Sequence, residues 1–214
     1  MLQIDADIKL WEARLADRPE SHQLSYARRE LGFAVYAASA GLYGSAFASL
    51  RLFLELSFAA VYFSANEFNR RQWASGRRDF SWSAALDENN GVLSQSFVRE
   101  FNESAVPEVT YYAVDALCAY RDCSEFMHGK ITSTRFLPET LSFSATALEK
   151  WARLAIRSAE SVLFLLYCRY GDELLNGDDD GSLSCTLEHS FSHLVSVRKL
   201  LGLPLDHEDV KDAR

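Results

Sequence analysis

An arginine and a histidine near the end of one predicted helix are the residues of this sequence best suited to chemistry. Arg121 and His128 are seven residues apart, so on a helix of about 3.6 residues per turn they project from nearly the same face. A neutral imidazole can take a proton from a hydroxyl or give one to a leaving oxygen. An always-protonated guanidinium can stabilise charge on a phosphate. Arg121 and His128 are therefore candidate catalytic residues of an RNA-cleaving pair.

The neighbours of this pair are typical of a helix end. Gly129 can adopt the left-handed conformation that closes a helix. Asp122 is a third candidate catalytic residue, which would orient Arg121 or the imidazole, although adjacent helical residues point about 100° apart. A structural interpretation is also open, in which Arg121 bridges Glu125 one turn away and His128 interacts with the helix C-terminus.

The elements that must position these residues are helices. Apolar residues recur at helical spacing and never alternate in a strand-like period. We expect one all-α helical-bundle domain of six to seven helices over residues 1–203, followed by a charged tail over 204–214. The predicted helices cover residues 4–15, 21–40, 45–71, 92–102, 109–127, 145–170 and 185–201.

Several helix ends have a local signal. Ser144 is expected to cap the helix that begins at residue 145, and Gly171 is expected to end it. Residues 131–143 contain β-branched residues and Pro138, which predicts an irregular excursion or a short hairpin.

Composition excludes some classes of protein. The chain has 214 residues and a net charge of −8, so it has no global basic field for nucleic acid. There is no P-loop, no G-x-G-x-x-G and no G-x-S-x-G motif, and we expect no cofactor. The four cysteines form no C-x-x-C pair, and the first residues lack a basic region. We therefore expect a reduced, cytoplasmic protein without a secretory signal.

One segment is long and apolar enough to suggest a membrane helix. Residues 41–65 are largely apolar, but Arg51 and Glu55 lie in the middle. Each charge would cost about 2.5–3.5 kcal/mol at the centre of a membrane-inserted helix. Because the two are four residues apart, they are expected to pair on a soluble core helix, and we predict no membrane span.

A basic and aromatic segment lies between residues 70 and 87. We favour the interpretation that its tryptophans anchor a loop to the core. The alternative is an RNA-binding patch, because single-stranded RNA is bound by arginine and aromatic planes. The candidate RNA-binding residues are Arg70, Arg71, Arg77 and Arg78, interleaved with Trp73, Phe80 and Trp82, together with Lys130 beside the catalytic pair.

Two patterns resemble metal sites without completing them. Residues 176–183 are similar to the start of an EF-hand loop, but the twelfth position is Leu187 and lacks the bidentate glutamate. His189 and His193 have a spacing that suits a metal, without the H-E-x-x-H order. We predict no metal site and interpret residues 176–188 as an acidic linker.

The run from Tyr120 to Gly129 resembles the Y-x-x-x-S-x-x-x-H-G helix ends of bacterial members of the HEPN superfamily. The six residues between Arg121 and His128 are the longest spacing that this superfamily shows. The resemblance implies a homodimer whose two Arg/His motifs face each other and cut RNA without a metal, in a toxin or anti-phage defence setting. It leaves open a non-catalytic module that binds a protein partner, as an accessory subunit or antitoxin. A helical bundle that binds a small molecule is a third interpretation.

Overall fold

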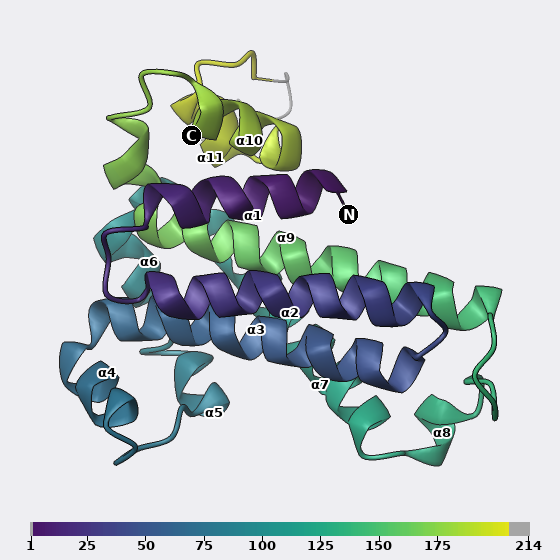
Figure 1. The fold of residues 1–214 in the computed structure, drawn as a ribbon. Coiled ribbons are helices and arrows are strands. Elements are labelled where there is room, and N and C mark those ends of the chain that lie inside the picture. The colour runs from purple at the N-terminus through teal and green to yellow at the C-terminus, as the bar shows by residue number, and fades with distance from the viewer. Residues whose placement is uncertain (1, 206–214) are drawn as a thin grey trace.

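The computed structural model describes residues 2–205 and is all-α, as predicted (Figure 1). These residues form eleven α-helices and one 3-10 helix, and none of them forms a strand. Residues 206–214, most of the predicted charged tail, lie outside the described part of the chain.

Four long helices run across the molecule and enclose most of its core (Figure 1). Helices α2 and α3 form an antiparallel hairpin, and α9 packs against both of them and against α1. Gly41 has a φ of 77° between α2 and α3, where an added Cβ would lie 2.9 Å from the carbonyl oxygen of Ser142. These helices are α1 (Leu2–Arg14), α2 (Ser21–Ser39), α3 (Tyr43–Ala65) and α9 (Ala145–Leu175).

The seven predicted helices become eleven because two are split and two short ones are added. The predicted helix over 45–71 breaks at Asn66, whose side chain accepts a hydrogen bond from the Asn69 backbone N–H at 3.0 Å and caps a separate helix. The predicted helix over 185–201 is broken at Leu194, which is extended. The resulting pairs are α3 with α4 (Glu67–Ala74), and α10 (Ser182–Phe191) with α11 (Val195–Leu200).

The remaining elements are mostly short. Residues 131–143 begin with a single helical turn rather than a hairpin, and the predicted helix over 92–102 begins only at Gln95, capped by Ser94. These elements are α5 (Trp82–Ala85), α6 (Gln95–Phe101), the 3-10 helix η1 (Glu103–Glu108), α7 (Val109–Met127) and α8 (Ile131–Thr134).

The prediction that Gly171 ends α9 is wrong. Ser144 caps this helix as predicted, accepting from the Ala147 N–H at 3.2 Å. The helix then continues through Gly171 to Leu175. A Cβ at position 171 would lie 2.7 Å from the Tyr167 ring. This glycine therefore permits close packing inside the helix instead of terminating it.

Helix α3 is the segment of the described chain that is long and apolar enough to cross a bilayer. The interior buries 61% of its most apolar window, which is compatible with the core helix of a soluble protein. Arg51 and Glu55 form the predicted ion pair at 2.9 Å.

The acidic linker binds protein groups on its own chain. Arg14 forms ion pairs with Asp178 at 3.3 Å and Asp180 at 2.6 Å. Asp178 also accepts from the backbone N–H groups of Leu183 and Ser184 at the start of α10. These carboxylates thus tie α1 to α10.

Candidate functional site

Helix α7 carries the candidate site and has the predicted bounds, Val109–Met127. It packs between α3 and α9 and leaves one face open. Gly129 ends it with a φ of 63°. The Lys130 N–H bonds the Glu125 carbonyl at 3.1 Å, and the Gly129 N–H bonds the Phe126 carbonyl at 3.2 Å. The predicted glycine termination is therefore confirmed.

Arg121 and His128 are both exposed. The His128 backbone N–H still bonds the Ser124 carbonyl at 3.0 Å, so His128 continues the helical path and shares a face with Arg121. The two side chains form no hydrogen bond or ion pair with any described residue. Seven residues correspond to a rise of about 10 Å, so the pair is spread along the helix.

The predicted bridge between Arg121 and Glu125 is absent from the described structure. Glu125 instead forms an ion pair with Lys130 at 2.5 Å and accepts a hydrogen bond from Ser133 at 2.5 Å. These two bonds lower the pKa of Glu125. Lys130, a predicted RNA-binding residue, is thus paired to α7, and Arg121 remains available to another molecule.

Two exposed apolar residues, Val114 and Leu117, extend the face that carries Arg121 and His128. They are 56% and 52% exposed, and their spacing to Arg121 of seven and four residues places them on the same side of α7. They line a groove of about 580 Å³ between α7 and residues 86–96. We call Val114, Leu117, Arg121 and His128 the open face of α7.

A polar network fixes one flank of the open face to α3. Arg51 donates to Ser124 at 3.1 Å and to the Tyr120 hydroxyl, and Tyr120 donates to Glu55 at 2.8 Å. Trp82 stacks on the Tyr120 ring with 4.0 Å between centroids. Burial, followed by the hydrogen bond to Glu55, raises the pKa of Tyr120. The network holds the last turns of α7 in a defined orientation.

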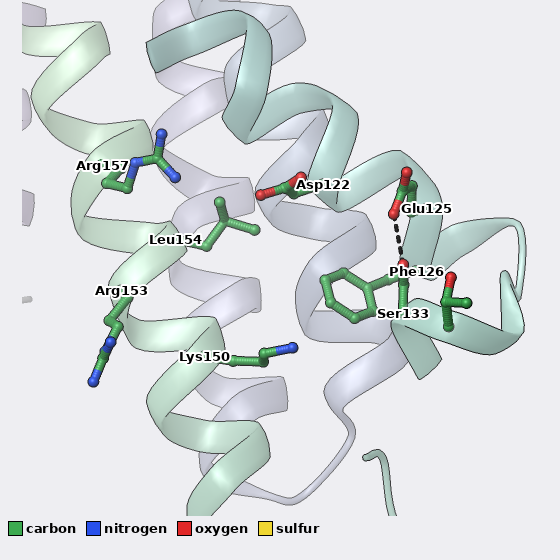
Figure 2. A pocket seen from close by; sticks show the side chains of 9 residues that line it. Asp122, Glu125, Phe126, Ser133, Lys150, Arg153, Leu154 and Arg157 are labelled. Atoms are coloured by element: carbon green, nitrogen blue, oxygen red, sulfur yellow. Dashed lines mark hydrogen bonds between the residues drawn. The ribbon is translucent and has the colours of Figure 1, made fainter. Parts of the chain in front are cut away.

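A cleft lies on the other flank, between the end of α7, α8 and the first half of α9 (Figure 2). Its volume is about 370 Å³. Asp122 points into it from α7, and Lys150 reaches toward it from α9 (Figure 2). Arg157 binds Asp115 through Nε at 2.9 Å and so ties α9 to α7 at one end of the cleft.

Asp122 faces α9 and forms no hydrogen bond or ion pair with a described residue. Burial raises its pKa, and the cations Arg157, Arg121 and Lys150 oppose that shift. The predicted orienting contact between Asp122 and Arg121 or His128 is therefore not formed within the described chain.

Replacing Asp122 by asparagine is expected to raise the melting temperature at neutral pH. A carboxyl group whose pKa is higher in the folded state favours the fold when it is protonated. This contribution is complete below the unfolded pKa of about 3.9, and it is lost as the pH rises through the folded pKa. The ionised carboxylate is thus unfavourable near pH 7, and an uncharged amide removes that cost. Melting curves near pH 7 and pH 4 should show that the melting temperature of Asp122→Asn exceeds that of the wild type by less at pH 4 than at pH 7. An increase of equal size at both pH values, or a decrease near pH 7, would contradict the raised pKa of Asp122.

The predicted arginine patch lies at the end of α3 far from α8 (Figure 1). Arg70 and Arg71 each bind Glu67 at 2.6 Å, and these two hydrogen bonds lower the pKa of Glu67 to about 2. Arg77 donates to Ser75 and Arg78 to Asn69. The chain therefore does not bring these arginines together with Arg121 and His128.

The aromatic residues of the same segment pack inward, as the favoured interpretation predicts. Trp73 lies 5.2 Å from Phe63, Phe80 lies 6.1 Å from Tyr62, and Trp82 lies 4.9 Å from Phe58, measured between ring centroids. They anchor the loop, and RNA binding by its arginines stays a prediction.

The histidine pair does not form one helix face. His189 lies in α10, which ends at Phe191, so His193 falls beyond the helix. Within residues 2–205, no three His, Cys, Asp or Glu side chains are grouped as metal ligands would be.

Sequence reasoning missed the partners that surround the open face. Arg51 was assigned only to Glu55, and its contacts with Tyr120 and Ser124 join segments about 70 residues apart. Lys150 and Arg157 were not singled out, and their spacing of seven residues on one helix was the available signal.

Comparison of the chain with known protein families, with curated proteins and with solved structures gave no match.

Proposed function

We propose that this protein is a metal-independent endoribonuclease of the HEPN type, in which Arg121 and His128 are the catalytic residues. One observation carries the proposal: both side chains are exposed on one face of α7 and form no hydrogen bond or ion pair with residues 2–205. A guanidinium and an imidazole that make no internal hydrogen bond or ion pair are available to a phosphate and a hydroxyl of a bound RNA. The polar network on α3 supports the proposal, because it holds the helix end that carries them.

His128 would take the proton of a ribose 2′-hydroxyl, whose oxygen then attacks the adjacent phosphorus. The bond from phosphorus to the 5′ oxygen breaks, and that oxygen is protonated by an imidazolium. Arg121 stabilises the charge that gathers on the phosphate. The products are a 2′,3′-cyclic phosphate and a 5′-hydroxyl.

The spacing of the pair favours a homodimer. Because Arg121 and His128 are about 10 Å apart along the helix, one chain does not readily bring both to the same phosphate. A twofold axis beside Ser124 would place Arg121 of one chain opposite His128 of the partner subunit. Val114 and Leu117 would then face the partner's residues just beyond α7, where Ile131 is also exposed.

Incubating the purified protein with single-stranded RNA and excess EDTA tests the reaction. Cleavage that persists and yields 2′,3′-cyclic phosphate and 5′-hydroxyl ends is the expected result. Intact RNA, or cleavage that EDTA abolishes, would contradict the proposal. A toxin or anti-phage role further predicts that expressing the protein arrests bacterial growth.

Replacing Leu117 by glutamate is expected to convert the dimer to a monomer and to lower cleavage at least about tenfold, since a charge would be buried in an apolar interface. Analytical ultracentrifugation and cleavage rates measure the two effects. Phe33→Glu is the matched control: Phe33 is also 52% exposed but lies on α2. A Leu117→Glu protein with unchanged mass and activity would refute the dimer.

A non-catalytic partner-binding module is the second candidate. It is favoured by the groove of about 580 Å³ beside Val114 and Leu117, which an apolar helix of another protein would fill. RNA cleavage by the purified chain at substoichiometric amounts would exclude this candidate.

A further inference from the structure

The cleft beside α7 holds two opposite charges that lack an ion-pair partner. Asp122 accepts no hydrogen bond from a described residue, and Lys150 makes only a cation–π contact, with its Nζ 4.0 Å from the Phe136 ring centroid. The other charges of the cleft are already paired: Glu125 with Lys130, Arg153 with Glu149 and Arg157 with Asp115. A ligand would therefore meet one carboxylate and one ammonium that are not engaged in an ion pair.

Between these charges the cleft is apolar. Leu154 lies between Asp122 and Lys150, and Phe126 lines the α7 side (Figure 2). The Phe126 ring is held by stacking on the Phe47 ring, with 3.7 Å between the ring centroids. Ligand sites span about 300–1,000 Å³, so a cleft of about 370 Å³ suits one planar group such as a nucleobase.

The charge pattern selects among ligands. A simple anion would satisfy Lys150 but would be repelled by Asp122, the carboxylate of the cleft that has no ion-pair partner. Guanine presents two adjacent donors, N1–H and the N2 amino group, which match the two acceptor oxygens of a carboxylate. Its O6 and N7 acceptors match a lysine. Adenine and cytosine offer a single amino donor, and uracil flanks its one N–H with two carbonyl oxygens.

We propose that this cleft is a guanine-binding site in which Asp122 accepts from N1–H and N2–H and Lys150 donates to O6 or N7. Single-stranded RNA is read through bases that swing out of the stack, and Asp122 is adjacent in sequence to Arg121. As a specificity site for cleavage, this inference rests on the proposed ribonuclease function. The guanine would come from the RNA substrate or from a free guanine nucleotide.

Binding measurements separate the two sources. The His128→Ala protein, which should leave RNA intact, is titrated with GMP and AMP, and with the RNA pentamers UUGUU and UUAUU. We expect guanine to bind about 5- to 150-fold more tightly than adenine, as for a bidentate base contact. A preference only in the pentamers identifies RNA as the source, and a preference with GMP alone identifies a free nucleotide. Equal affinity for guanine and adenine in both arms would overturn the proposal.

Asp122→Asn tests the carboxylate itself. An amide offers one acceptor and one donor, so the guanine preference should disappear in this variant. Asp172→Asn, near the far end of α9, is the matched control and should keep it. A preference that survives Asp122→Asn would refute the assignment. Base preference is measured without cleavage, so an inactive wild-type protein that still prefers guanine would disprove the ribonuclease function and leave the guanine site standing.

Discussion

Replacing His128 by alanine is expected to lower the rate of RNA cleavage by about 10²–10⁴-fold, the usual contribution of a general acid or base. Removing the imidazole leaves the 2′-hydroxyl without a proton acceptor, while Arg121 can still bind the phosphate. Initial rates on labelled single-stranded RNA in the presence of EDTA measure the effect. Arg121→Ala should also lose most activity, and Arg121→Lys should recover only part of it, because lysine keeps the charge but not the planar fork.

The fold should be unaffected by His128→Ala, since an exposed side chain without an internal hydrogen bond or ion pair changes stability by no more than about 0.5 kcal/mol. A melting curve like that of the wild type would establish this. His189→Ala, at an exposed position of α10, is the matched control and should cleave at the wild-type rate. If His128→Ala cleaved RNA as fast as that control, His128 would have no catalytic role.

The helices that were predicted well have strong local signals. The apolar period of α7 stops at a glycine that takes the left-handed conformation, so both its course and its end are encoded in consecutive residues. The break between α3 and α4 was missed because the apolar period runs through Asn66, and only the side-chain cap of Asn66 interrupts it. The end of α9 was predicted wrongly because Gly171 does not terminate the helix. It permits a close contact with Tyr167 on the preceding turn.

The candidate site was likewise predictable only where its residues lie close together in the sequence. Arg121 and His128 could be paired from the sequence, because helical geometry relates residues within one segment. Asp122 and Lys150 are 28 residues apart on different helices. The apolar period of each helix does not predict which face of α7 will pack against which face of α9. RNA binding by the arginines of α4 and its following turn was the alternative prediction and is untested; their side chains bind locally to Glu67, Ser75 and Asn69. For Asp122 and Lys150, by contrast, the packing of α7 against α9 decides that the two side chains line one cleft.

Replacing Phe47 by alanine is expected to destabilise the protein by about 3–5 kcal/mol, as for other large-to-small changes of buried aromatic residues. Phe47 is fully buried on α3 and stacks on Phe126, two residues before His128. Its loss would leave a cavity beneath the end of α7. For a chain of this size the melting temperature should fall by roughly 6–20 °C.

Phe33→Ala provides the comparison, because Phe33 is exposed on the neighbouring helix α2 and its truncation opens no cavity. It should change the melting temperature by at most about 2 °C. The Phe47→Ala protein, assayed well below its melting temperature, should also cleave RNA more slowly, because Phe126 would no longer be held and the position of His128 would be less defined. Equal losses of stability in the two variants would show that α3 does not support the end of α7 in this way.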